Sequence, residues 1–307
     1  MKFEGVLFFP VTPFNEAGGV DVALLKEHIA SRLEFSPGGI FPACGTGEFH
    51  ALSIAEVRTV VQATVEVVAG TVPVIAGAGG PLGHALDAAR AAAEVGADAL
   101  LVLPPYLVGA PMDGLVAYVE AIAAASELPV IVYHRANAKF SAASMVKLAA
   151  NPKVIGFKDG VGDVGLAQEI VSAVRATGRK DFQFFNGLLT AELTQGAYRG
   201  LGMPLYSSAA FAMAPEIATA YYRAYIEGNE ERRAELIEGF YAPLVRLRDE
   251  VPGFGVSLIK AGIRQGGLPV GPVRPPLVNP TAEQEARLAA ILAKGHELAA
   301  SYALANA

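Results

Sequence analysis

The sequence contains no tryptophan and a single cysteine, Cys44, among its 307 residues. One cysteine cannot form an internal disulfide, so the cysteine content of the chain does not indicate an oxidising compartment. Charged residues make up only 18% of the chain, below the usual share of about a quarter in a soluble protein. This deficit favours a fold with much buried surface, or one that also buries surface in an oligomer.

Several kinds of protein are excluded by other missing features. A net charge of −6 without a Lys/Arg cluster argues against a nucleic-acid-binding surface. The start lacks the basic-then-apolar pattern of a signal peptide. The longest apolar stretch, residues 115–133, is interrupted by Glu120, Glu127 and Pro129, so it does not predict a membrane span. No histidine spacing typical of metal ligands and no nucleotide-phosphate motif appears. We therefore expect a cytoplasmic protein that needs neither metal nor cofactor.

Short apolar runs alternate with patterns of 3.6-residue spacing along the first two thirds of the chain. The runs are continuously apolar, as in parallel strands covered on both faces. They cover residues 6–9, 39–42, 73–76, 99–103, 130–133, 154–157, 182–185 and 204–206. Eight β-then-α units predict an α/β fold, a closed (β/α)8 TIM barrel over residues 1–212. A doubly wound open sheet is the alternative, because periodicity cannot show whether a sheet closes.

Strand signals stop after residue 212. Helical patterns follow, joined by a Pro- and Gly-rich connection over residues 267–280. They cover residues 215–227, 230–249, 256–266 and 281–304. No low-complexity linker separates them from the barrel, so we expect residues 213–307 to pack on it as one structural unit.

Polar or glycine residues recur where the apolar strands end. In a barrel, the C-terminal strand ends and the loops that follow build the active site. The residues at these positions are Thr12, the segment 45–48, Gly77, Tyr106, Tyr133, Lys158, Asn186, Ser207 and Ser208. The sequence therefore predicts a polar site at one end of the barrel.

Lys158 directly follows the buried run 154–157. Burial penalises an ammonium and lowers its pKa, which leaves a neutral amine able to attack a ketone. On these residues alone, a lysine that reaches solvent or pairs with Asp159 or Asp163 is the alternative. Tyr133 ends the neighbouring strand, about 4.8 Å away. A phenol there can move protons during the formation and dehydration of a carbinolamine.

The segment 45–48 (Gly-Thr-Gly-Glu) has the composition of an anion-holding turn. Glycines let backbone N–H groups approach a ligand, and Thr46 adds a hydroxyl. We expect Glu48 to be structural and to tie the loop down.

Three segments together resemble the dihydrodipicolinate synthase/N-acetylneuraminate lyase family. They are Gly-Thr-Gly-Glu at 45–48, Tyr133, and Gly-Phe-Lys-Asp at 156–159. The resemblance covers nearly the whole chain, from Phe-Pro-Val-Thr-Pro-Phe at 9–14 to the C-terminal helices. It implies a (β/α)8 barrel and a Schiff base between Lys158 and a 2-keto acid. It also implies a homo-oligomer, commonly a tetramer of paired dimers.

Two departures separate the chain from the dihydrodipicolinate synthases. The first threonine of their Gly-Thr-Thr-Gly-Glu motif is Gly45 here, and the tyrosine that they insert across a dimer is Leu107. The relay of two tyrosines and a threonine that those enzymes use therefore cannot be assembled here. Their carboxylate-binding arginine also lacks a clear match after Tyr133. The departures fit a branch of the family that acts on keto-deoxy sugar diacids. Segments 157–163, 206–209 and 271–277 resemble the sequences of this branch.

This branch implies a dehydratase that decarboxylates its substrate. It would convert 5-dehydro-4-deoxy-D-glucarate into 2,5-dioxopentanoate, CO2 and water. Lys158 and Tyr133 would be catalytic, and Gly45, Thr46 and Gly47 would hold the near carboxylate. Expected distal contacts are Arg135, Asn137, Asn186, Ser207 and Ser208. One alternative is an aldolase of the same family that releases pyruvate. Another is a non-catalytic sugar-acid sensor, which would be expected to lose the lysine or the tyrosine.

Overall fold

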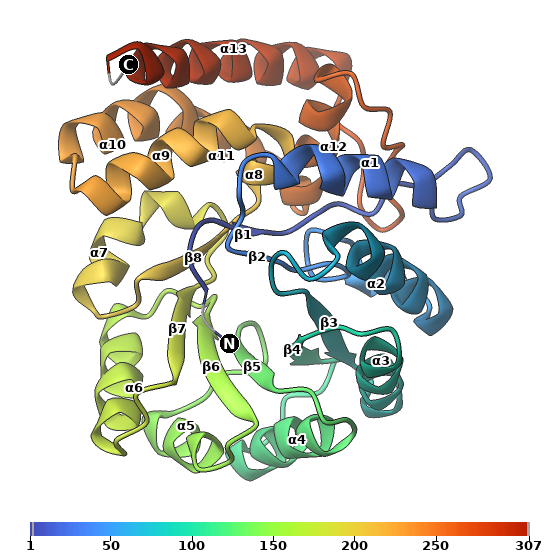
Figure 1. Cartoon of the computed structure of the whole chain (residues 1–307), viewed down its shortest axis with the longest axis vertical. Helices are drawn as coiled ribbons and strands as arrows, with labels where there is room; N and C mark the ends of the chain where they lie inside the picture. Colours follow the sequence, from blue (N-terminus) through green and yellow to red (C-terminus); the bar gives the residue numbers. More distant parts are fainter. Residues whose placement is uncertain (2, 306–307) are drawn as a thin grey trace.

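Eight short parallel strands form a barrel in the computed structural model, which describes residue 1 and residues 3–305 (Figure 1). The strands are β1 (Leu7–Phe8), β2 (Gly39–Ile40), β3 (Ile75–Gly80), β4 (Ala99–Pro105), β5 (Val130–His134), β6 (Val154–Asp159), β7 (Gln183–Asn186) and β8 (Leu205–Ser208). Their hydrogen-bonded order is β2-β1-β8-β7-β6-β5-β4-β3. A parallel bridge between Ile40 and Val74 joins the two edges. The predicted barrel is therefore confirmed, and the open doubly wound sheet does not form.

Several strands continue beyond the apolar runs that predict them. β5 extends to His134 and β6 to Asp159, so Tyr133 and Lys158 lie within strands. The two residues are partners in the β5–β6 register. Successive side chains on a strand point to opposite faces. Neighbouring polar residues at a strand end therefore cannot all face the same space.

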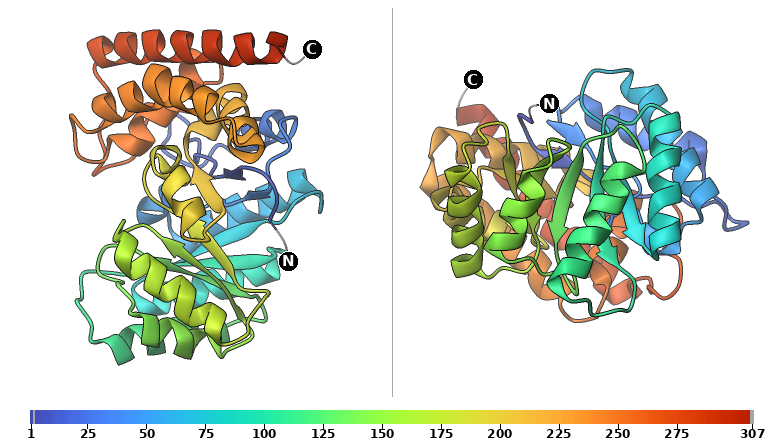
Figure 2. Two further views of the ribbon diagram at one scale, coloured as in Figure 1. Left: turned by 90° about the vertical axis from the view of Figure 1, so that its left-hand side faces the viewer. Right: turned by 90° about the horizontal axis from the view of Figure 1, so that it is seen from below.

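Helices and short helical turns follow the strands and cover the outside of the barrel (Figure 2). A capping box of Ser53 and Glu56 is present at the start of α2. The helices are α1 (Val22–Leu33), α2 (Ile54–Val68), α3 (Leu82–Glu94), α4 (Met112–Ala124), α5 (Ala142–Ala149), α6 (Val164–Ala176), α7 (Gln195–Gly200) and α8 (Ala210–Met213), with 3-10 turns η1 (Phe49–Ala51) and η2 (Ala191–Leu193).

The C-terminal helices stack on one side of the barrel, next to α8 and α1 (Figure 1). They are α9 (Pro215–Glu227), α10 (Glu230–Leu236), α11 (Ala242–Arg248), α12 (Phe254–Gln265) and α13 (Ala282–Ala305). A π-helical turn, η3 (Ile237–Tyr241), divides the predicted helix over 230–249. Buried side chains such as Phe211, Leu258 and Ile259 belong to one apolar cluster that spans barrel and tail. Within the described residues, no helix combines the length and apolarity needed to cross a membrane.

Candidate active site

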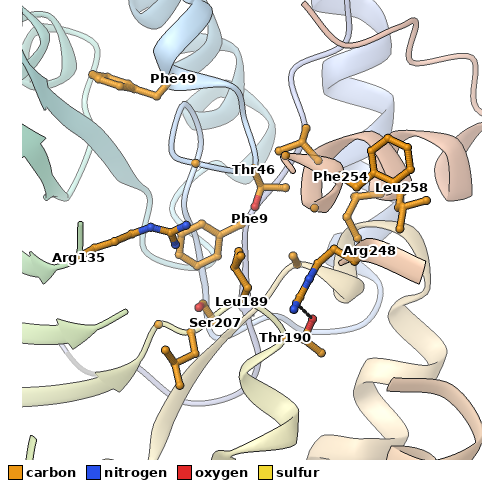
Figure 3. Close-up of a pocket in the computed structure, with 18 of the residues that line it drawn as sticks. Phe9, Thr46, Phe49, Arg135, Leu189, Thr190, Ser207, Arg248, Phe254 and Leu258 are labelled. Carbon is orange, nitrogen blue, oxygen red and sulfur yellow. Dashed lines mark hydrogen bonds between the residues drawn. The ribbon is translucent and has the colours of Figure 1, made fainter. Parts of the chain in front are cut away.

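A cavity of about 670 Å³ lies where the strands end (Figure 3). The barrel contributes Thr46 after β2, Tyr133 from β5, Lys158 from β6, Gly187 after β7 and Ser207 from β8. Much of the remaining wall comes from α11, α12 and the loop between them. The C-terminal tail thus forms one side of the cavity, which has the size of a small-molecule site.

Lys158 is buried, with 4% of its surface exposed. Its Nζ atom lies 3.8 Å from the centroid of the Tyr133 ring and 5.2 Å from that of Phe9. The backbone carbonyl of Gly187 accepts a hydrogen bond from Nζ at 3.5 Å. Burial lowers the pKa of Lys158 below 10.5, and the neighbouring Tyr133 opposes this only in part. The amine is therefore neutral more often than that of a surface lysine.

The two aspartates near Lys158 are engaged elsewhere. Asp159 accepts hydrogen bonds from two backbone N–H groups of the loop that follows it and from the Tyr198 hydroxyl. Asp163 caps α6 by accepting from the backbone N–H of Leu166 at 3.0 Å. No ion pair to Lys158 exists among the described residues. A lysine held in place by these carboxylates is therefore the wrong interpretation.

Tyr133 contacts Lys158 through its ring and the guanidinium of Arg135 through its hydroxyl. Its hydroxyl donates to the Gly187 carbonyl at 2.8 Å and accepts from Nη1 of Arg135 at 2.8 Å. Burial acts to raise the pKa of Tyr133, but the charges of Lys158 and Arg135 outweigh it and hold the pKa below 10.0. The phenol can therefore release and recover a proton more readily than a free tyrosine.

Two of the three residues in the turn 45–47 border the cavity, whereas Gly47 is buried and does not line it. Gly45 and Thr46 line the cavity, and Thr46 is half-buried. Thr12 donates from its hydroxyl to the Gly47 carbonyl at 2.7 Å, which fixes the far side of the turn. The preceding Cys44 is buried, and burial raises the pKa of its thiol to about 12. It stays protonated and does not compete with Lys158 as a nucleophile.

Glu48 ties this turn to the C-terminal tail. Its carboxylate pairs with Lys260 of α12 at 2.6 Å, and both side chains are fully buried. It also accepts from the backbone N–H of Arg274 at 2.8 Å. The ring of Phe14 contacts both cations, with its centroid 4.1 Å from Lys260 Nζ and 4.0 Å from Arg274 Cζ. The structural role expected for Glu48 is confirmed.

Arg135 and Ser207 line the cavity, but the other three expected distal contacts do not. Asn137 donates to the backbone carbonyls of Pro105, the last residue of β4, and of Val108 in the loop that follows, at 3.0 and 2.9 Å. Asn186 is fully buried and donates to η2 and to the loop after it. Ser208 donates to the buried carboxylate of Glu192. Asn186 and Ser208 are turned away from the cavity because alternate residues of a strand face opposite sides, whereas Asn137 lies in the turn after β5 and is held by the carbonyls of Pro105 and Val108.

The cavity also has polar lining residues that no sequence pattern indicates. Thr190 lies in the loop after β7, Arg248 is the last residue of α11, and Asp249 comes directly after it. Nη1 of Arg248 donates to the Thr190 hydroxyl at 2.8 Å. Their place in the site depends on how the tail packs over the barrel, which a local pattern does not encode.

The fold and the site fit a lyase on a (β/α)8 barrel that acts on a small carbonyl compound. The chain belongs to the dihydrodipicolinate synthetase family, whose model matches residues 2–295. It is 52% identical over 304 residues to a probable 5-dehydro-4-deoxyglucarate dehydratase of Streptomyces griseus, covering 98% of this chain and 95% of that one. A probable 5-dehydro-4-deoxyglucarate dehydratase of Streptomyces coelicolor is 50% identical, covering 96% and 94%.

Solved structures agree with this assignment. Dihydrodipicolinate synthase from Oceanobacillus iheyensis superposes with a TM-score of 0.88 at 26% identity, covering 96% of this chain and 97% of that chain. The overlap includes the C-terminal helices as well as the barrel, since nearly the full length is aligned.

Proposed function

We propose that this protein is a dehydratase that converts 5-dehydro-4-deoxy-D-glucarate into 2,5-dioxopentanoate, CO2 and water. The observation that carries the proposal is the position of Lys158 Nζ, 3.8 Å from the centroid of the Tyr133 ring in the lining of the cavity. The relatives that share about half of the sequence are named for the same activity. The reaction starts at the ketone next to one of the two carboxylates.

Lys158 forms the covalent intermediate. Its neutral Nζ attacks the ketone carbon and gives a carbinolamine, whose hydroxyl leaves as water with a proton that Tyr133 delivers. The hydroxyl of Thr46 and the backbone N–H groups of the turn hold the adjacent carboxylate. The product of this step is an iminium that withdraws electrons from the neighbouring CH2 group.

Dehydration follows from this electron withdrawal. Tyr133, or a water bound beside it, takes a proton from the CH2 group and leaves an enamine. The enamine expels the hydroxyl two carbons from the former ketone, and that hydroxyl departs as water after it is protonated. The new double bond is conjugated with the iminium and extends to the carbon next to the one bearing the far carboxylate.

Decarboxylation uses the same electron sink. The bond to the far carboxylate breaks, CO2 leaves, and the bonding pair moves through the conjugated system to nitrogen. Protonation and tautomerisation convert the resulting enol into an aldehyde. Hydrolysis of the iminium with one water then releases 2,5-dioxopentanoate and restores Lys158. The net reaction yields one CO2 and one water for each substrate molecule.

Product analysis tests the proposal directly. The protein is incubated with 5-dehydro-4-deoxy-D-glucarate, and CO2, 2,5-dioxopentanoate and pyruvate are measured. Equal amounts of CO2 and 2,5-dioxopentanoate are expected; pyruvate instead would identify an aldolase, and binding without turnover would identify a sensor. Borohydride reduction in the presence of pyruvate should attach the adduct to Lys158, and Lys158→Ala should abolish it. An adduct on another residue would overturn the mechanism.

We also propose that the enzyme acts in the cytoplasm as a homo-oligomer, a dimer or a tetramer. The low share of charged residues, 18%, supports burial of surface between copies. Light scattering coupled to size-exclusion chromatography measures the mass of the particle. A mass near the 31.9 kDa of one chain would contradict the oligomer.

A further inference from the structure

Arg248 approaches the cavity from the side opposite to Arg135 (Figure 3). It is the last residue of α11, and 15% of its side chain is exposed. Nη1 donates to the Thr190 hydroxyl at 2.8 Å, and Nε donates to Asp249 at 2.8 Å. These bonds hold the guanidinium in one orientation at the cavity wall. An arginine fixed in this way is ready to pair with a planar anion.

Thr190, the partner of Arg248, lies in a backbone conformation that its residue type avoids. Its φ is +53°, in the left-handed region, although it is β-branched. Such outliers are concentrated at functional sites, where the surroundings hold them in place. Thr190 is also only three residues after Gly187, whose carbonyl accepts from Tyr133 and Lys158. One loop thus links the reacting end of the cavity to the Arg248 end.

The surroundings of Arg248 strengthen an ion pair between its guanidinium and a bound anion. The cavity wall on this side is apolar and comes mostly from the tail, with Leu189, Leu244, Val251, Phe254 and Leu258. Apolar walls reduce screening by water, so an ion pair there is stronger than one on the surface. Asp249 neutralises part of this charge, but its side chain is 59% exposed and it binds only Nε.

Arg135, the other guanidinium of the cavity, has a different task. Its Nη1 donates to the hydroxyl of Tyr133, so it acts where protons move. Among the described residues that line the cavity, the lysine and arginine side chains are Lys158, Arg135 and Arg248, and one histidine, His50, lies beside the Thr46 turn. With Lys158 consumed as the imine, Arg248 is the cation at the end remote from the reacting carbon.

We infer that Arg248, oriented by Thr190, binds the second carboxylate of the substrate and makes the site selective for keto diacids. This inference rests on the proposed function, because it assumes that the ketone end is held at Lys158. It assigns to the C-terminal tail the choice of substrate, while the barrel strands supply the chemistry.

Two unreactive keto acids of equal length test the assignment. 2-Oxoadipate has six carbons and a carboxylate at each end, and 2-oxohexanoate has a methyl group in place of the far carboxylate. Neither has a hydroxyl to eliminate, so both stop at the imine that borohydride traps on Lys158. The concentration that gives half-maximal trapping is measured for each, with pyruvate as the compound that has no distal end.

Arg248→Gln should raise this concentration for 2-oxoadipate by about 10- to 100-fold, the loss expected for one charge-assisted contact. It should leave 2-oxohexanoate and pyruvate unchanged, which also shows that the variant is folded. Arg248→Lys should recover part of the preference, since it keeps the charge without the planar fork. Arg246→Gln is the matched control, because Arg246 is an exposed residue of the same helix outside the cavity lining.

Equal weakening of both six-carbon acids, or no weakening of either, would overturn the role of Arg248. These outcomes leave the proposed function intact if the wild-type protein still releases CO2 from 5-dehydro-4-deoxy-D-glucarate. Conversely, a wild-type protein that releases no CO2 refutes the proposed function, and the 2-oxoadipate comparison still decides what Arg248 does.

Discussion

Lys158 and Tyr133 are register partners on β6 and β5, and Nζ of the lysine lies 3.8 Å from the centroid of the tyrosine ring. Neighbouring parallel strands are about 4.8 Å apart, so a residue pair at the same height can act on one substrate atom. The carbonyl of Gly187 accepts from both side chains and fixes their relative positions. The sheet itself therefore positions the amine and the phenol before any substrate binds.

Removing the phenol hydroxyl should slow imine formation without removing the amine. We expect Tyr133→Phe to lower the rate at which the borohydride-trapped pyruvate adduct forms by about 10²- to 10⁴-fold. This is the usual contribution of a positioned proton donor. The ring stays in place over Lys158, so the amount of adduct at long times should approach that of the wild type. Circular dichroism checks the fold. Trapping at the wild-type rate would show that Tyr133 only packs against the lysine.

The charge of Arg135 should set the pH at which imine formation begins. It lowers the pKa of Lys158, which burial already lowers, and it helps to lower the pKa of Tyr133. The attacking amine must be neutral, so the trapping rate should rise with pH through an inflection below 10.5. Arg135→Gln removes a positive charge, which raises both pKa values and should move the inflection to higher pH.

The measurement is the rate of pyruvate trapping against pH for both proteins. Lys139→Gln is the control, because it removes a positive charge from the same loop at an exposed position. An unchanged or lower inflection in Arg135→Gln would contradict the sign of this interaction.

The parts of the site that could be predicted from the sequence are those that depend on one strand or one turn. Lys158 after an apolar run signals a buried amine, because desolvation acts on a residue wherever its strand is covered. The capping box of Ser53 and Glu56 is a similar case, since it depends on two residues of the same helical turn. The alternation of strand and helix patterns likewise predicts the barrel, although the strand lengths differ by a few residues.

The parts that could not be predicted depend on strand ends and on distant packing. Asn186 and Ser208 lie close behind apolar runs as Lys158 does, but each is the last residue of its strand and its side chain faces away from the cavity. A shift of one residue reverses the face. Arg248 lies 90 positions after Lys158 in the sequence, and only the packing of the tail over the barrel brings it to the same cavity.

Removing one partner of the buried pair Glu48–Lys260 should destabilise the fold strongly, because the other partner is then left as an uncompensated buried charge. Lys260→Met leaves an unpaired carboxylate with no exposed surface, and should lower the free energy of unfolding by about 3–5 kcal/mol. The Gly45–Gly47 turn should loosen with it, which raises KM more than it lowers kcat. Chemical denaturation and steady-state kinetics measure the two effects.

Adding Glu48→Gln to Lys260→Met should recover part of the lost stability, because the uncompensated charge disappears. Lys26→Met breaks the exposed pair of Lys26 with Glu66 and should change stability little. Equal stability losses in Lys26→Met and Lys260→Met would show that burial of the pair is not what matters.

Gly187 should tolerate no side chain, because the space beside its Cα is occupied by Lys158. A methyl group added there would lie 2.6 Å from both Cγ and Nζ of Lys158 and 2.9 Å from the carbonyl oxygen of Asp159. Backbone cannot yield as easily as a side chain, so Lys158 has to move and its hydrogen bond to the Gly187 carbonyl is disturbed. A displacement of about 1 Å can cost about 10²-fold in rate, and we expect Gly187→Ala to slow pyruvate trapping by at least that factor.

Gly83 on α3 offers the matched control, since a methyl group there meets nothing within 4 Å. Gly83→Ala should trap pyruvate at the wild-type rate and be slightly more stable, because alanine favours the helix. If Gly187→Ala instead traps pyruvate as fast as the wild type, then Lys158 has enough freedom to reach the ketone from another position. In that case the amine would not be held in place by its neighbours, and the proton transfers assigned to Tyr133 would lose their geometric basis.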